Sequence, residues 1–278
     1  MQYITFNLIF NRRKDSYIIM IKNSSIWRSF YSAWLLICDY DLPVAWRPVN
    51  GEQGEQSFNA LYAMPVWGAL GGMAAIVLGG LFLWLLPVNG AAIIFAMVLT
   101  AAGELRTSSR ALALSVSTFE QLIARKSLVK ARQNRICSLN GTSGLVPVLL
   151  AVGLLGGKFF AILLAARTGH FGIAGAAWVA ALSAEGVLAA DPHAASVPAV
   201  CRSARAEYIV GIAGFLLLFN LIALPLATLI AVALAAVITI SVLNWCLKRT
   251  GYIAADDITV TGYLLELAVW AVFALMIG

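Results

Sequence analysis

The residues best suited to chemistry lie in one basic stretch, residues 100–144. It carries seven of the chain's nineteen Lys and Arg residues and two carboxylates, Glu104 and Glu120. Long apolar runs flank it on both sides, which predicts that it is the main aqueous loop of a membrane protein. We expect any chemistry of this protein to centre on this loop, where anionic groups would meet concentrated positive charge. A solvated loop without a ligand explains the same charge.

Three more ionisable residues, Lys158, Glu185 and Glu266, lie within or at the edges of apolar runs. Charge is costly there and usually faces the interior of a helix bundle. A Lys158–Glu185 ion pair is one hypothesis. The alternative is that Lys158 extends its ammonium to the membrane surface, or is neutral in a packed core. Small residues at the spacings Gly68–Gly72 and Gly153–Gly157 predict close helix packing.

The elements that must position these residues are transmembrane helices. The chain has 278 residues, of which 61% are apolar and 12% charged, and its mean hydropathy is +0.88. Soluble proteins average about 45–50% apolar and about 25% charged residues. The composition therefore predicts an all-α polytopic membrane protein, with an N-terminal extension (residues 1–25) and a single integral membrane domain (residues 26–278). The net charge of +6 is explained by basic cytoplasmic loops rather than by nucleic-acid binding.

Apolar runs long enough to cross about 30 Å of hydrocarbon predict seven transmembrane helices. An aromatic-rich helix over residues 26–36 precedes them and is too short to span, which indicates a helix at the membrane interface. The basic loop is expected over residues 106–143, with an amphipathic helix over residues 117–135. The expected spans are residues 66–86, 91–103, 145–166, 171–190, two helices within 208–247 divided near Pro225, and 262–278.

The distribution of positive charge predicts the orientation in the membrane. If the N-terminus is cytoplasmic, seventeen Lys and Arg residues fall on the cytoplasmic side and only Arg167 falls outside, with Lys158 inside a span. This asymmetry predicts a cytoplasmic N-terminus and an external C-terminus. The four cysteines then lie near the reducing side and lack metal-ligand spacing, which argues against disulfides and a cysteine metal site.

Four segments follow one another in a recognisable order: SAWLLICDYDLPVAW (residues 32–46), AMPVWGALGGMAA (63–75), GTSG (141–144) and KRTGYIAADDITVTGYLLEL (248–267). Their order and spacing resemble those of the adenosylcobinamide-GDP ribazoletransferases, also called cobalamin synthases. Lys158 stands where members of that family often have a lysine. The resemblance covers about residues 25–278 and rests on the collinear order of the segments.

The resemblance implies a transferase of the bacterial inner membrane that joins adenosylcobinamide-GDP to alpha-ribazole or its phosphate, uses Mg²⁺ and releases GMP. It also implies corrinoid and nucleotide ligands, and a homo-oligomer is a further prediction. The acidic motif of the family aligns with AAGELRTSSRALA (residues 101–113). In this stretch Glu104 replaces a His, and Arg106, Arg110 and Ala113 replace three Asp residues.

The candidate site residues follow from this alignment. The remaining carboxylates could hold one Mg²⁺ ion, because magnesium prefers carboxylate and phosphate oxygens. The candidate catalytic and metal-binding residues are Glu104, Asp256 and Asp257, and the candidate substrate-binding residues are Arg106, Arg110, Lys158, Gly141 and Gly144.

Two alternatives remain open, because cations replace metal-binding carboxylates in the acidic motif. One is a degenerate, non-catalytic relative that acts as a binding or assembly partner. The other is a small-molecule transporter, although no inverted repeat relates the two halves of the chain. The CDP-alcohol phosphotransferases do not fit, because their D-x-x-D-G-x-x-A-R signature is absent.

Overall fold

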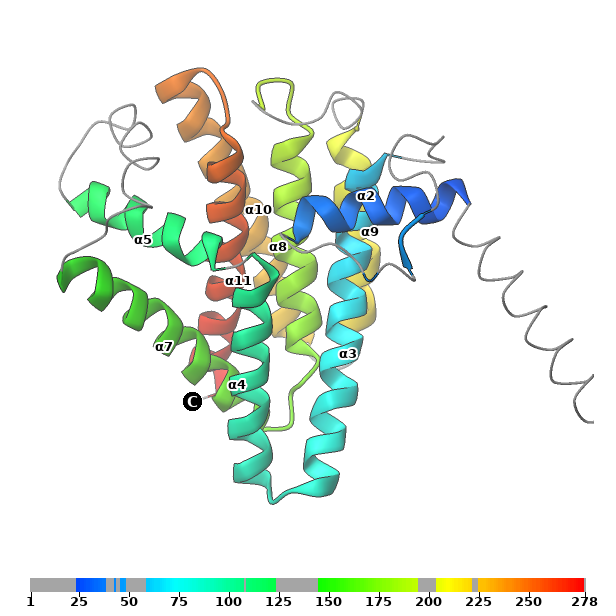
Figure 1. Cartoon of the computed structure of the whole chain (residues 1–278), viewed down its shortest axis with the longest axis vertical. Coiled ribbons are helices and arrows are strands. Elements are labelled where there is room, and N and C mark those ends of the chain that lie inside the picture. The colour runs from blue at the N-terminus through cyan, green and yellow to red at the C-terminus, as the bar shows by residue number, and fades with distance from the viewer. Residues whose placement is uncertain are drawn as a thin grey trace, which may run out of the picture.

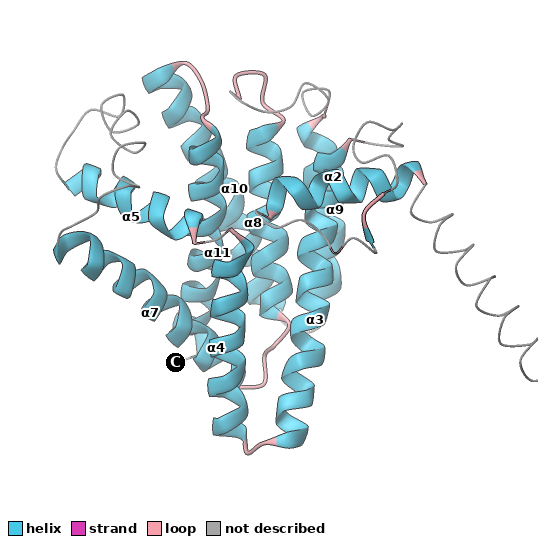
Figure 2. Ribbon diagram, in the orientation of Figure 1, coloured by secondary structure: helices cyan, strands magenta, loops and turns pink. Residues whose placement is uncertain are grey.

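The computed structural model describes residues 24–38, 43, 46–48, 59–107, 109–123, 145–194, 204–221 and 225–277. Over these residues the protein is all-α, as the composition predicts (Figure 2). Its elements are α2 (Ser25–Ile37), the 3-10 helix η3 (Ala60–Ala63), α3 (Met64–Leu85), α4 (Val88–Arg106), α5 (Arg110–Ile123), α7 (Leu145–Arg167), α8 (Ile173–Ala189), α9 (Ala206–Leu221), α10 (Pro225–Thr250) and α11 (Ala255–Ile277).

Four helical segments in the described part of the chain are long and apolar enough to cross a membrane. They are η3 with α3 (Ala60–Leu85), α4, α7 and α11 up to Met276. Helix α8 is apolar too, but its 17 residues rise only about 26 Å, a little less than the hydrocarbon thickness. The structure therefore describes a protein compatible with membrane embedding.

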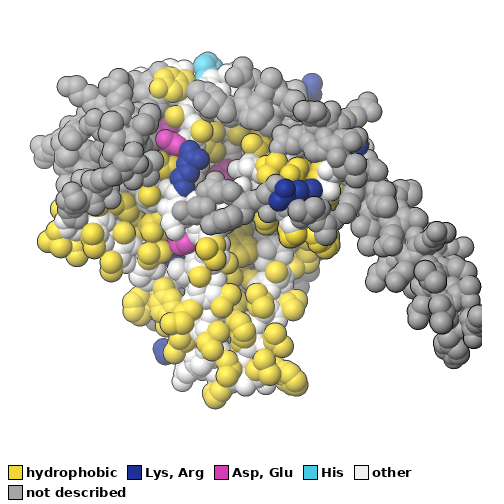
Figure 3. Space-filling view, in the orientation of Figure 1, with side chains coloured by type: hydrophobic (Ala, Val, Ile, Leu, Met, Phe, Trp, Pro, Cys, Tyr) yellow, Lys and Arg dark blue, Asp and Glu magenta, His cyan; other side chains and the backbone are white. Residues whose placement is uncertain are grey.

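Two amphipathic helices lie across the bundle, whereas α3, α4, α8, α9 and α11 run mainly along its long axis (Figure 1). The first is α2, the helix expected over residues 26–36, which begins where Ser24 Oγ accepts a hydrogen bond from the Trp27 N–H at 3.1 Å. Trp67 on α3 donates its indole N–H to the Phe30 carbonyl at 3.0 Å and so joins α2 to the bundle. The second is α5. On the face seen in Figure 3, apolar side chains cover most of the bundle below these helices.

Helix α8 is the centre of the fold, since most of its side chains are buried. Its Ala- and Gly-rich sequence lets α3 approach closely. A Cβ added at Gly68 would lie 2.7 Å from the Val179 nitrogen, and one added at Gly72 would overlap the Gly175 backbone. The packing role predicted for Gly68–Gly72 is confirmed. The one predicted for Gly153–Gly157 is wrong within the described chain, where an added Cβ at either glycine meets no atom within 4 Å.

The end of α4 and the start of α11 differ from the sequence predictions, and both differences involve charged residues. Helix α4 continues through Glu104 to Arg106, so the expected aqueous loop does not begin at residue 100. Helix α11 begins at Ala255 rather than at residue 262, so Asp256 and Asp257 lie in its first turn. The amphipathic helix expected over residues 117–135 is α5, which begins earlier, at Arg110, and is described as far as Ile123. The rest of the predicted range lies outside the described residues.

Candidate functional site

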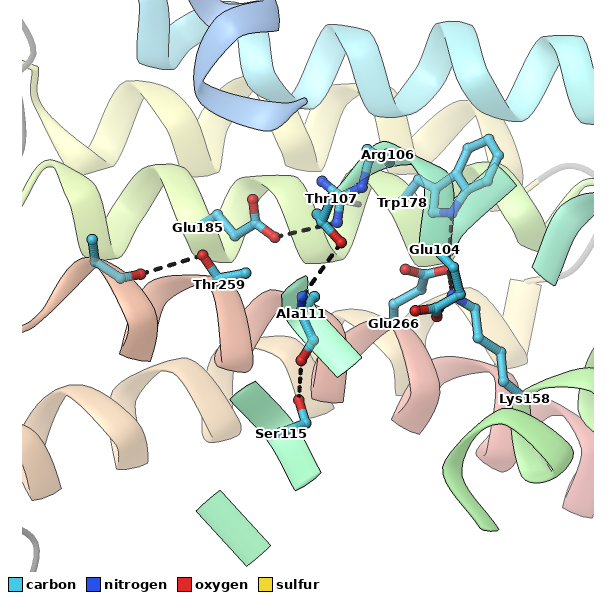
Figure 4. Close-up of polar contacts among 11 residues, drawn as sticks. Glu104, Arg106, Thr107, Ala111, Ser115, Lys158, Trp178, Glu185, Thr259 and Glu266 are labelled. Atoms are coloured by element: carbon cyan, nitrogen blue, oxygen red, sulfur yellow. Dashed lines mark hydrogen bonds and ion pairs between the residues drawn. The ribbon is translucent and has the colours of Figure 1, made fainter. Parts of the chain in front are cut away.

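Five ionisable side chains from four helices meet inside the bundle (Figure 4). We call them the charged cluster: Glu104 and Arg106 of α4, Lys158 of α7, Glu185 of α8 and Glu266 of α11. Lys158 is 1% exposed and Glu266 2%, and the other two carboxylates are also buried. Ionisable side chains inside apolar helices are rare and mark functional sites, because a buried charge must be compensated.

In one half of the cluster, Lys158 contacts two carboxyl groups. Its Nζ lies 3.0 Å from Glu266 Oε1 and 3.7 Å from Glu104 Oε1. Trp178 of α8 donates its indole N–H to the same Glu266 oxygen at 3.0 Å. The Lys158–Glu185 pair of the sequence hypothesis is wrong, because α7 packs against α4 and α11 and so presents Lys158 to their carboxylates.

Arg106 and Glu185 form the other half of the cluster. Arg106 Nη2 lies 3.6 Å from Glu185 Oε1, which is longer than a hydrogen bond. The buried Nη1 atom of Arg106 has no hydrogen-bond partner among the described residues. The guanidinium therefore retains donor capacity beyond its pairing with Glu185.

Glycines allow the helices to close around these charges. A Cβ added at Gly103 would lie 2.5 Å from Lys158 Nζ, and one added at Gly262 would overlap the Glu185 carboxylate. Both positions therefore require a residue without a side chain if the cluster is to keep its geometry.

A cavity of about 580 Å³ adjoins the cluster, a volume typical of small-molecule sites. Its walls come from α2, α3, α4 and α8, and they are apolar except near Arg106. Three tryptophans, Trp34, Trp67 and Trp178, contribute to the walls. Arg106 and Trp178 belong both to the cavity and to the network of the cluster, so they connect the two.

Among the described residues, the other predicted site residues have partners outside the cluster. Arg110 Nη2 pairs with Asp256 Oδ1 at 3.0 Å in a partly exposed position. Asp257 is buried, and its Oδ2 accepts a hydrogen bond from the Ala254 N–H at 3.1 Å, which caps the start of α11. Gly141 and Gly144 lie outside the described residues.

The described residues do not fit the magnesium site implied by the resemblance. Glu104 lies near Glu266, which is nine residues beyond Asp257 on α11, a rise of about 14 Å. Among the described residues, no group of three or more His, Cys, Asp and Glu side chains could hold a metal ion. Glu104, Asp256 and Asp257 are therefore not brought together around one ion, and we derive no reaction step through Mg²⁺.

Sequence reasoning identified the charged members of the cluster but missed the residues that complete it. Trp178 and Tyr263 look like ordinary apolar-helix residues, although the Tyr263 ring centroid lies 5.2 Å from Lys158 Nζ. Gly103 and Gly262 carried no signal that separates them from other helix glycines.

Comparison of the chain with protein-family models, with curated proteins and with solved structures finds no match. Membership of the cobalamin synthase family therefore stays a prediction. The function has to be argued from the cavity and the charged cluster.

Proposed function

We propose that this protein binds an amphipathic organic anion, a molecule with an apolar body and a carboxylate or phosphate group, inside its membrane domain. The observation that carries the proposal is the composition of the cavity, which is apolar except for Arg106. Apolar walls favour an apolar body, and one cation fixes the position of an anionic group. This function agrees with one alternative that the sequence leaves open, namely a degenerate, non-catalytic relative that acts as a binding or assembly partner.

The state of the Arg106 guanidinium supports this proposal. Its separation from Glu185 of 3.6 Å and the unpartnered Nη1 mean that a ligand oxygen could gain a charge-assisted hydrogen bond without first breaking a short one. Water is a weak competitor in a cavity with so little polar surface, which strengthens the interaction. Trp34, Trp67 and Trp178 offer rigid aromatic faces to the apolar body.

Replacing Arg106 with glutamine is expected to weaken ligand binding about 10- to 100-fold, the equivalent of one charge-assisted hydrogen bond. The measurement is the equilibrium affinity for decyl phosphate of the purified protein in lipid nanodiscs. Arg110→Gln is the matched control, since Arg110 lies on α5 outside the cavity and pairs with Asp256. Equal affinities of the wild type and the Arg106→Gln variant, or an equal loss in both variants, would contradict the proposal.

The membrane arrangement that we infer has about seven spans, formed by α3, α4, α7, α8, α9, α10 and α11. The distribution of Lys and Arg residues supports a cytoplasmic N-terminus, with α2 and α5 at the cytoplasmic interface. The bacterial inner membrane is what the resemblance to the cobalamin synthases implies. The α3–α4 turn would then face outward and the end of α10 would face the cytoplasm.

In a cysteine-free background, Asn89→Cys is expected to react with a membrane-impermeant maleimide in intact cells. Both Asn89, in the first turn of α4, and Lys248, near the end of α10, are exposed. Lys248→Cys is expected to react only after the cells are permeabilised. The reverse pattern would mean that the orientation is the opposite of the one inferred. Reaction of both variants in intact cells would mean that α10 or a neighbouring helix does not cross the membrane.

A second candidate function is the ribazole transfer implied by the resemblance. It is favoured by one contact, the Arg110–Asp256 ion pair, because this pair joins the aligned stretch 101–113 to the C-terminal segment 248–267. Condensation of adenosylcobinamide-GDP with alpha-ribazole phosphate in lipid, with and without Mg²⁺, tests it. Turnover that is lost in Asp256→Asn would support the transferase, and no turnover in folded protein would reject it.

A further inference from the structure

The charged cluster contains one more carboxylate than it has cations. Glu104, Glu185 and Glu266 face Arg106 and Lys158, so full ionisation would leave one uncompensated negative charge inside apolar helices. A buried charge without a partner costs several kcal/mol, and a carboxyl group avoids that cost by keeping its proton. We propose that Glu104 holds an exchangeable proton, which makes the cluster a proton-binding site within the membrane domain.

The contacts single out Glu104 as the protonated group. Glu266 has Lys158 at 3.0 Å and the Trp178 N–H at 3.0 Å, and Glu185 has Arg106 at 3.6 Å. Glu104 shares Lys158 with Glu266, at the longer distance of 3.7 Å, and its other polar neighbour is the neutral side chain of Tyr263. Both carboxylate oxygens of Glu104 are buried without a hydrogen-bond partner among the described residues, whereas only Oε1 of Glu185 is, and Glu104 is 9% exposed.

The groups around Glu104 are compatible with a neutral acid. Lys158 comes from α7, Tyr263 and Glu266 from α11, Glu185 from α8, and Arg106 follows on α4. At the end of α2, Cys38 lines the same cavity as Arg106 and lies near it. With Glu104 neutral, the positive and negative charges cancel within each of the two pairs, Lys158–Glu266 and Arg106–Glu185. The cluster then has no net charge.

The proton site is connected to the cavity through side chains in contact. Glu104 contacts Lys158, Lys158 pairs with Glu266, and Glu266 accepts the hydrogen bond of Trp178, which lines the cavity. An anion placed at Arg106 would add negative charge beside the cluster and favour the proton on Glu104. This coupling rests on the proposed function, whereas the proton on Glu104 does not.

Infrared difference spectroscopy of the ligand-free protein in lipid tests the proton directly. At neutral pH we expect the carbonyl band of a protonated carboxyl group, shifted by exchange into D₂O and absent from Glu104→Gln. The control Glu207→Gln, which changes an exposed carboxylate in the first turn of α9, should retain the band. Because no ligand is added, failure here is distinct from failure of the proposed function.

A second variant keeps the test decisive if Glu104→Gln does not fold. Glu104→Asp retains the acid in a shifted position, so the band should persist at a changed frequency. The absence of a protonated-carboxyl band from the wild type at neutral pH would overturn the proposal. A band unchanged in Glu104→Asp, or one present in folded Glu104→Gln, would also overturn it.

Discussion

Replacing Lys158 with methionine is expected to lower the free energy of unfolding by about 3–5 kcal/mol, the usual cost of leaving a buried charge without its partner. Lys158 is 1% exposed and lies 3.0 Å from Glu266 and 3.7 Å from Glu104. The methionine fills much of the same volume, so the loss would come from charge rather than from a cavity. The measurement is thermal or denaturant unfolding of the purified protein in detergent.

The double variant Lys158→Met, Glu266→Gln separates charge from packing. It removes the cation together with the carboxylate that depends on it most, so it should be more stable than Lys158→Met alone. Arg167→Gln, at the exposed end of the same helix, should unfold like the wild type. A Lys158→Met variant as stable as Arg167→Gln would contradict the buried ion pair. So would a double variant whose loss of stability equals the sum of the losses in Lys158→Met and in Glu266→Gln.

The second large effect is expected from Gly72→Ala on α3. The added Cβ would overlap the Gly175 backbone, so α3 and α8 must move apart, at a cost of about 1–3 kcal/mol for an overpacked contact. The measurement is again the unfolding of the purified protein. Separation of these helices would also change the cavity, whose walls include α3 and α8, so ligand affinity should fall in parallel.

Gly80→Ala is the matched control, because Gly80 lies on the same helix and an added Cβ there meets no atom of the described residues within 4 Å. Alanine is the better helix former, so this change should leave stability unchanged or raise it by a few tenths of a kcal/mol. Equal effects of the two substitutions would show that α3 and α8 do not approach each other as closely as described.

The sequence predicted helices well where apolar residues continue without charge. The run after Met64 corresponds to α3, and the apolar run between the basic stretch and Arg167 corresponds to α7. It failed at the ends of α4 and α11, because charged residues such as Glu104 and Asp256 favour polar segments outside helices in the sequence pattern. Contacts with other elements, from Glu104 to Lys158 and from Asp256 to Arg110, allow these side chains to lie within helices.

The candidate site was predicted only in part for a related physical reason. A charge in an apolar run is visible in the sequence, so Lys158, Glu185 and Glu266 could be recognised. Their pairing depends on which helices are neighbours, and α7 packs against α4 and α11 rather than beside Glu185. The cavity depends on how α2 covers α3, α4 and α8, a tertiary feature with no local sequence pattern.

An experimental structure of the protein in a lipid nanodisc with saturating decyl phosphate would show directly whether the cavity binds an amphipathic anion. We expect the phosphate group within hydrogen-bond distance of Arg106, with the alkyl chain in the cavity among α2, α3, α4 and α8. A probe bound at the exposed Arg110–Asp256 pair instead, or an empty cavity at saturation, would contradict it.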